Sequence, residues 1–91
     1  MQLAMHLGMP ASASGFSQYV LFEYSPRTPK AVLFTNHVRR DPGFPKQIGQ
    51  RSTLDLYVRH RAPWAKDGAA EAWRGYDRWR RQKHAERKEA A

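Results

Sequence analysis

Three arginines in the last third of the chain have a spacing that suits phosphate binding. Arg74, Arg78 and Arg81 follow one another at intervals of four and three residues, so that in a helix successive guanidinium groups lie about one turn apart. Such a row can follow phosphates along nucleic acid without reading its sequence. The same spacing also describes a solvated helix face, and Asp77 offsets part of the charge because it can pair with Arg81.

Two further groups of cations could extend this positive surface. Arg39 and Arg40 lie together in a stretch rich in turn-forming residues, and Arg59 and Arg61 flank a histidine. Clustering of these groups on one face would strengthen the case for nucleic acid, whereas dispersal over the surface would weaken it. The outcome depends on the fold that carries them.

Three tryptophans lie close to the arginine row in the sequence. Trp64, Trp73 and Trp79 supply flat surfaces on which unpaired bases could stack beside arginines. The helical spacing of Trp73 with Tyr76 favours packing in the core instead. Trp64 follows Pro63 and is the tryptophan that we expect to be exposed. It would suit a protein interface as well as nucleic acid, because tryptophan and arginine are enriched at binding hot spots.

Few residue pairs are suited to catalysis. His37 with Asp41, and His60 with Asp55, could serve acid–base chemistry or bind a cation. Neither pair has the spacing of a known metal or nuclease motif, and the chain lacks a glycine-rich phosphate loop and a nucleophile elbow. Cysteine is absent, which excludes thiolate metal sites and thiol catalysis. The sequence therefore predicts a protein that is not an enzyme, with no metal ligands and no cofactor.

The composition favours a polyanionic partner. The chain has 91 residues, with 16 Lys and Arg against 8 Asp and Glu, and a formal net charge of +8. In so small a body this excess creates a positive potential over much of the surface, although it could serve solubility alone. No apolar run is long enough to span a membrane, and the first residues lack the basic flank of a signal peptide. We therefore expect a cytoplasmic protein with no membrane contact.

The sequence predicts that a small α+β domain carries these residues. We expect residues 16–37 to form an antiparallel hairpin, because two stretches rich in β-forming residues are separated by a short loop with two prolines. Residues 52–60 are ambiguous. Leu54, Leu56 and Val58 alternate as in a third strand, whereas Ser52 and the acid three residues later resemble the start of a helix. We favour the third strand.

One amphipathic helix is expected over residues 68–87, packed across one face of this sheet. Its apolar stripe is made of Ala69, Ala72, Trp73, Tyr76 and Trp79. The sheet residues expected to meet that stripe include Val20, Phe22, Val32 and Phe34. The single domain would then span residues 16–87, preceded by a flexible or short-strand segment over 1–15 and followed by a frayed tail over 88–91.

The leading functional prediction is a non-catalytic basic module that binds nucleic acid, or joins a nucleoprotein assembly, through the arginine-rich helix face. The alternative is a small protein-binding module that docks on an acidic protein surface, such as an inhibitor, a phage-type host-modulating protein or an accessory subunit. Homodimerisation through an uncovered hairpin edge fits both interpretations.

Overall fold

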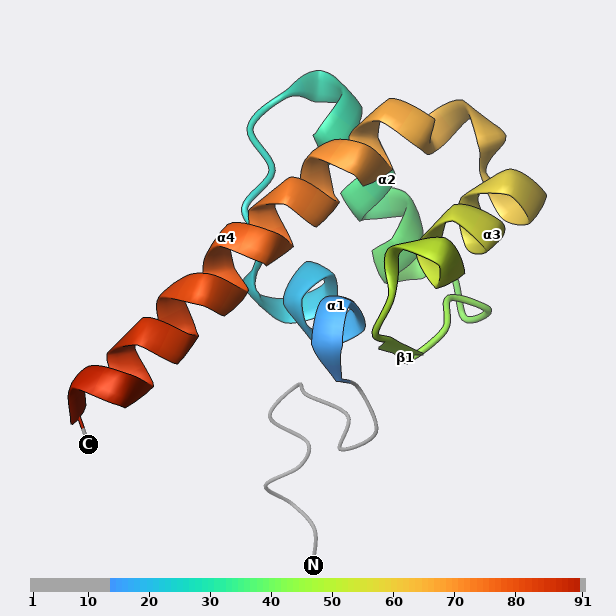
Figure 1. Ribbon diagram of the computed structural model, residues 1–91. Coiled ribbons are helices and arrows are strands. Elements are labelled where there is room, and N and C mark those ends of the chain that lie inside the picture. Colours follow the sequence, from blue (N-terminus) through green and yellow to red (C-terminus); the bar gives the residue numbers. More distant parts are fainter. Residues whose placement is uncertain (1–13, 91) are drawn as a thin grey trace, which may run out of the picture.

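The fold is built from helices. A computed structural model describes residues 14–90 of the chain (Figure 1). In chain order its elements are α1 (Gly15–Gln18), a π-helical segment η2 (Tyr19–Glu23), α2 (Pro29–Arg40), the strand β1 (Gln47–Ile48), α3 (Arg51–Arg61), a 3-10 segment η3 (Pro63–Ala65) and α4 (Lys66–Ala90). No helix within this described part is long and apolar enough to cross a membrane. The expectation for residues 1–15 lies outside the described part, apart from its last two residues.

The predicted α+β fold is wrong, because residues 16–37 form helices and not an antiparallel hairpin. The backbone N–H of Ala31 donates a 3.2 Å hydrogen bond to Thr28 Oγ1, and Pro29 occupies the first position of α2. A capping threonine followed by proline is a strong start signal for a helix, and here it outweighs the β-propensity of the residues that follow. The hairpin edge invoked for homodimerisation is therefore absent.

The predicted third strand over residues 52–60 is also wrong. These residues belong to α3, in which Leu54, Tyr57 and Val58 are buried. Their spacing is that of one helix face, and Leu56, which should share a strand face with Leu54, is 51% exposed. The alternation of apolar residues was therefore too short to distinguish a strand from a helix.

The strand β1 ties the loop before α3 to the start of α1. Its two residues bridge Ser14 and Gly15 in parallel, and they form no larger sheet in the described chain. The hydroxyl of Ser17 donates to the carbonyl oxygen of Pro45 at 2.7 Å and accepts from the backbone N–H of Ile48 at 3.1 Å. Gly15 has a φ of +58°, a conformation that favours glycine.

The helix predicted over 68–87 is present as part of α4, but it packs on helices and not on a sheet. Trp73 and Tyr76 lie against Phe16, with ring centroids 5.1 and 5.7 Å away. Trp79 contacts Tyr19 of η2 at 5.2 Å. The aromatic stripe thus covers α1 and η2. Among the residues expected to meet it from a sheet, those buried are Val20 and Phe34, and those exposed are Phe22 and Val32.

The helices α2 and α4 lie close together at Gly68. A Cβ atom at this position would overlap the carbonyl oxygen of Lys30 and lie 2.9 Å from the Cβ of Phe34. Two turns later on the same face, a Cβ at Gly75 would lie 2.7 Å from the hydroxyl of Tyr19. Glycines at these two positions let α4 lie close to α2 and η2, which determines the face of α4 that meets solvent.

The substitution Gly68→Ala tests this close approach. Alanine is the better helix former by about 1 kcal/mol, but the clash with the rigid backbone of α2 costs about 2 to 3 kcal/mol. We expect the free energy of unfolding to fall by about 1 to 2 kcal/mol in urea denaturation. Gly49→Ala is the control, because a Cβ there meets nothing within 4 Å. A Gly68→Ala protein as stable as the wild type would contradict the packing.

Candidate nucleic-acid interface

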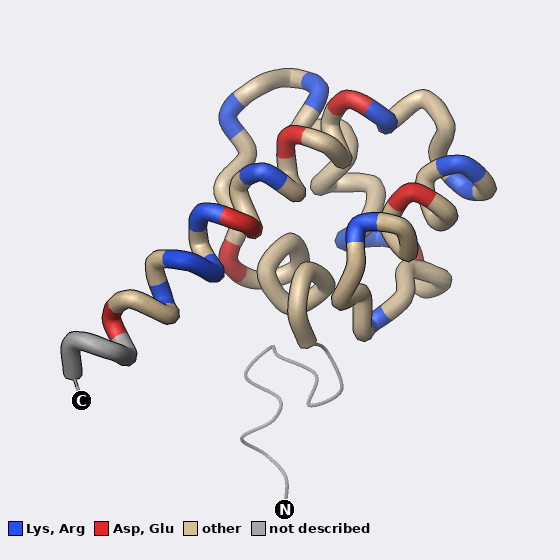
Figure 2. The backbone as a smooth tube through the Cα atoms, in the orientation of Figure 1, with Lys and Arg blue, Asp and Glu red and all other residues tan. Residues whose placement is uncertain are grey.

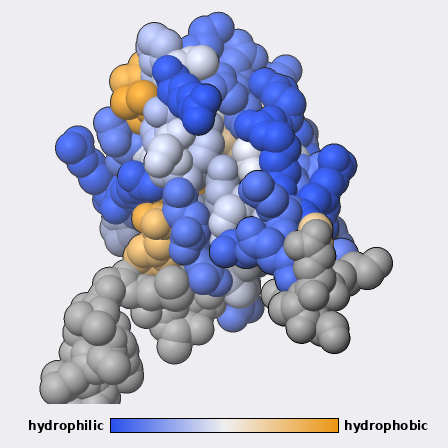
Figure 3. Space-filling view, turned by 90° about the vertical axis from the view of Figure 1, so that its left-hand side faces the viewer, coloured by the Kyte–Doolittle hydropathy of each residue, from blue (hydrophilic) through white to orange (hydrophobic). Residues whose placement is uncertain are grey.

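The solvent face of α4 carries the arginine row, defined as Arg74, Arg78 and Arg81, and all three side chains are exposed. Lys and Arg recur along α4 from its middle towards its end (Figure 2). Figure 3 shows the side of the molecule on which α4 ends, and hydrophilic side chains cover most of it. The packing of the aromatic stripe inward therefore leaves the cations outward.

Neighbouring donors engage the described acidic side chains of α4. Asp67 pairs with Lys30 at 3.2 Å, and Glu71 accepts a 2.8 Å hydrogen bond from the hydroxyl of Thr28. Asp77 accepts hydrogen bonds from Arg80 and Arg81, and the bond from Arg80 is the main reason that its pKa is lowered. The remaining described acid, Glu86, is 3.9 Å from Lys83.

This pairing divides the arginine row into two kinds of residue. Arg81 shares Asp77 with its neighbour Arg80. Arg74 and Arg78 have no acidic partner among the described residues. Their guanidinium groups are therefore free to bind an external anion.

A hollow of about 400 Å³ lies beside the row, between η2, the connection to α2, and α4. Arg78 lines it from α4 and Arg27 from the connection, while Glu23 and Glu71 also lie on its wall. Burial, followed by the charge of Glu71, raises the pKa of Tyr24, and the charges of Arg78 and Arg74 oppose this rise. Arg27 is thus a cation near the row that sequence reasoning missed, since the two prolines beside it indicated only a turn.

Arg39 has a structural role. Its Nε donates to the carbonyl oxygen of Val20 at 3.1 Å, and its Nη2 donates to that of Tyr24 at 2.9 Å. It thereby satisfies carbonyl groups of η2 and of the residue that follows, which have no helical partner. The adjacent residues Arg39 and Arg40 therefore have different surroundings. Arg39 holds η2 against α2, whereas Arg40 lines a hollow that also contains Trp64.

Arg61 is held by a polar network around Asp41. Its Nε and Nη2 donate to the two carboxylate oxygens at 3.0 and 2.9 Å, and Tyr57 and the backbone N–H of Gly43 donate to the same carboxylate. The side chain of Asp41 is only 6% exposed. Hydrogen bonds from Arg61 and then Tyr57 hold the pKa of Asp41 well below its usual range, while burial and then Asp41 raise the pKa of Tyr57. The network joins the end of α2 to α3.

A second surface, the α2–η3 hollow, contains the exposed tryptophan. Trp64 is 57% exposed and meets His37 edge to face at 5.3 Å. Leu33, which is 59% exposed, shares with it a hollow of about 570 Å³ that Arg40 and Arg61 also line. The expected exposure of Trp64 is confirmed, and three residues selected from the sequence meet here, away from the arginine row.

Arg59 lies at a third place, the hollow between α3 and α4, together with Arg51 and Lys66. The predicted cations are therefore dispersed over three surfaces and one structural contact. Such dispersal weakens the case for a single broad nucleic-acid surface and leaves the arginine row as the most coherent part of it.

The two histidine–aspartate pairs differ in geometry. His37 Nε2 is buried without a hydrogen-bond partner, 3.8 Å from an Asp41 oxygen. That carboxylate is already engaged by Arg61 and Tyr57. Asp55 pairs with Arg51 at 3.0 Å, and within the described chain it forms no ion pair with His60. The described residues contain no group of three or more His, Asp or Glu side chains arranged to hold a metal ion.

Comparisons with models of protein families, with curated proteins and with solved structures gave no match. The functional argument for this protein therefore depends on its own residues.

The network around Asp41 predicts a pH-dependent stability. Because its pKa is lower in the folded than in the unfolded chain, the ionised carboxylate stabilises the fold above a pH of about 4, and this contribution is lost as the pH falls towards the folded value. We expect Asp41→Asn to lower the melting temperature at neutral pH by roughly 5 °C, and the difference from wild type to shrink below a pH of about 4.

The control is Asp55→Asn, which removes an exposed ion pair with Arg51 and should change the melting temperature little at any pH. Circular dichroism melts of both variants and of the wild type, from a pH of about 2.5 to neutrality, would cover the upper part of the expected transition, where the difference should already shrink. A difference for Asp41→Asn that stays constant over this range would contradict the assigned network.

Proposed function

We propose that this protein is a non-catalytic nucleic-acid-binding protein that contacts the phosphate backbone through Arg74 and Arg78, the two unpaired residues of the arginine row. The supporting observation is the pairing pattern on α4, in which the described acids are engaged by neighbours while Arg74 and Arg78 are exposed and unpaired. Arginine guanidinium groups bind phosphate oxygens with two parallel hydrogen bonds. The residues Arg74 and Arg78 lie about 6 Å apart along the helix axis.

The burial of the aromatic residues favours backbone contact over base stacking. Trp73 and Trp79 are partly buried against the core, and Lys83 lies over the ring of Trp79 at 6.0 Å. Their rings are therefore less accessible to an unpaired base than the ring of Trp64, which lies away from the arginine row. We therefore expect similar affinity for duplex and single-stranded DNA, strong dependence on salt and little dependence on sequence. A cytoplasmic location is part of this proposal, and the absence of cysteine is compatible with it.

The double variant Arg74→Gln/Arg78→Gln tests the proposal. Fluorescence anisotropy with a labelled mixed-sequence duplex would give affinity at several salt concentrations. We expect weaker binding at every salt concentration, and a slope of log K against log salt that falls by about 0.9 for each phosphate that the variant no longer neutralises.

Arg80→Gln/Arg81→Gln is the matched control. It removes the same two charges from the same helix, but from side chains that Asp77 already holds. Its effect should be clearly smaller. Equal reductions of affinity in the two double variants would mean that net charge alone drives binding, and unchanged binding in Arg74→Gln/Arg78→Gln would refute the proposed contact.

A second candidate function, docking on an acidic protein surface, is favoured by the α2–η3 hollow. Trp64 and Leu33 are more than half exposed there, beside the cations Arg40 and Arg61. Arg61 is paired with the carboxylate of Asp41, which also lines the hollow, so the unpaired positive charge among the described residues comes from Arg40. Exposed tryptophan beside arginine is typical of residues that dominate protein interfaces.

Two synthetic polymers separate this candidate from simple charge attraction. A random copolymer of glutamate and tyrosine offers carboxylates with aromatic rings, whereas polyglutamate offers carboxylates alone. We expect the wild type to bind the copolymer more tightly, and Trp64→Ser to lose that preference while retaining duplex binding. Equal affinity of the wild type for both polymers would count against a docking surface at Trp64.

A further inference from the structure

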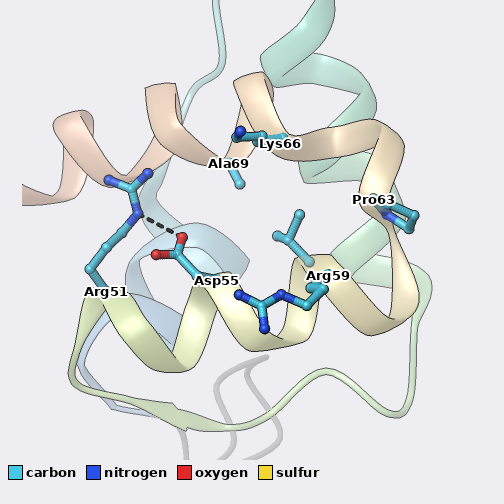
Figure 4. Close-up of a pocket in the computed structure, with 7 residues that line it drawn as sticks. Arg51, Asp55, Arg59, Pro63, Lys66 and Ala69 are labelled. Carbon is cyan, nitrogen blue, oxygen red and sulfur yellow. Dashed lines mark hydrogen bonds and ion pairs between the residues drawn. The ribbon is translucent and has the colours of Figure 1, made fainter.

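The hollow between α3 and α4 has the make-up of a small anion site. It has a volume of about 440 Å³ (Figure 4) and shares no lining residue with the α2–η3 hollow. Its lining residues are Arg51, Asp55, Val58, Arg59, Pro63, Lys66 and Ala69. Cationic and apolar side chains thus share one concave surface, formed by two helices and the segment η3 between them.

Positive charge exceeds negative charge in this α3–α4 hollow. Asp55 is its one acidic lining residue, and the carboxylate is bound by Arg51 Nε at 3.0 Å. Arg59 and Lys66 have no acidic partner among the described residues. In Figure 4 Asp55 lies between Arg51 and Arg59 along α3, with Lys66 across the hollow on α4. An entering anion would therefore meet unpaired cations from both helices.

The positions of two cations strengthen the positive field. Arg51 is the first residue of α3 and Lys66 the first residue of α4. A helix N-terminus carries partial positive charge, which makes a cation there unfavourable and an anion favourable. The first turn of α3 contains no acidic residue to offset this, whereas the first turn of α4 contains Asp67. A bound anion would therefore relieve repulsion mainly at the start of α3.

The floor of the α3–α4 hollow is apolar. Val58 and Ala69 form the base of the hollow and are already almost fully buried, at 6% and 3% exposure, so the open apolar surface is the exposed ring of Pro63 at one side. A bare inorganic ion would leave this ring in water. A ligand with an apolar part next to its anionic group would cover it and gain affinity from the burial.

We infer that the α3–α4 hollow binds the phosphate group of a nucleotide, with the base or sugar packed against the ring of Pro63. Arg59 and Lys66 bind the phosphate directly, and Arg51 contributes as it exchanges Asp55 for the ligand. The nucleotide is either free or part of a nucleic-acid strand, since both present the same chemistry. This inference uses none of the residues of the arginine row.

Nitrogen-15 NMR titrations at constant ionic strength test the inference. The probes are inorganic phosphate, adenosine monophosphate and a short oligonucleotide, followed through the Nε–H signals of the arginines and the backbone signal of Lys66. We expect inorganic phosphate to shift Arg51, Arg59 and Lys66 more than Arg27 or Arg40. Adenosine monophosphate should bind more tightly than phosphate, because it also covers the ring of Pro63.

Two exposed substitutions should change the affinity in opposite directions. Arg59→Gln removes one charge-assisted hydrogen bond and should weaken adenosine monophosphate binding about tenfold. Asp55→Asn removes the competing carboxylate and frees Arg51, so it should tighten binding. Both side chains lie on the surface of α3, and the dispersion of the backbone signals reports whether each variant remains folded.

The outcomes identify the source of the nucleotide. Local shifts with adenosine monophosphate support a free nucleotide, and local shifts with the oligonucleotide alone support a nucleic-acid strand. Shifts spread evenly over all arginines, or binding unchanged in Arg59→Gln, would overturn the inference. The Arg74→Gln/Arg78→Gln protein should retain the response of the hollow, so failure of the arginine row and failure of this site give different results.

Discussion

The close contact of α2 with α4 at Gly68 is the constraint on which the rest of the structure depends. With the axis of α4 held against the backbone of Lys30, the aromatic stripe can only cover α1 and η2, and the opposite face must meet solvent. Gly75 repeats the requirement two turns later against Tyr19. The outward direction of the cations on α4 is thus a consequence of two missing side chains. The packing that orients α4 therefore also determines which surface of the protein carries the positive charge of this helix.

Three acidic residues connect separate elements of the fold, while Asp55, Asp77 and Glu86 pair with cations on their own helix. Asp67 and Glu71 both join α4 to the start of α2, and Asp41 joins the end of α2 to α3. Because the acids are used in this way, they neutralise cations at the joints of the fold and leave others unpaired on the open faces. This allocation explains how a chain with ion pairs on most of its helices still presents a positive surface.

Sequence reasoning predicted the C-terminal helix because its stripe of aromatic residues extends over several turns, where the helical period is unambiguous. It failed for residues 16–37 and 52–60, since runs of about eight apolar and β-branched residues fit both periods. Pro26 and Pro29 also indicated a hairpin loop, whereas Thr28 and Pro29 begin α2. Exposure of Trp64 followed from the proline before it. The roles of Arg39 and Arg61 could not be predicted, because their partners lie at least 15 residues away in the sequence.

The free end of α4 introduces a gradient of local stability along the helix. Its last described side chains, residues 81–86, are all exposed, and the helix extends beyond the body of the protein (Figure 1). A helix end without packing opens at little free-energy cost, whereas the stretch covering Phe16 opens only with the core. An anion bound near the end must first immobilise it, and that entropy cost reduces the net affinity. Cations at different positions on α4 therefore contribute differently to binding affinity. Those on the turns that pack against the core hold a ligand on a rigid support.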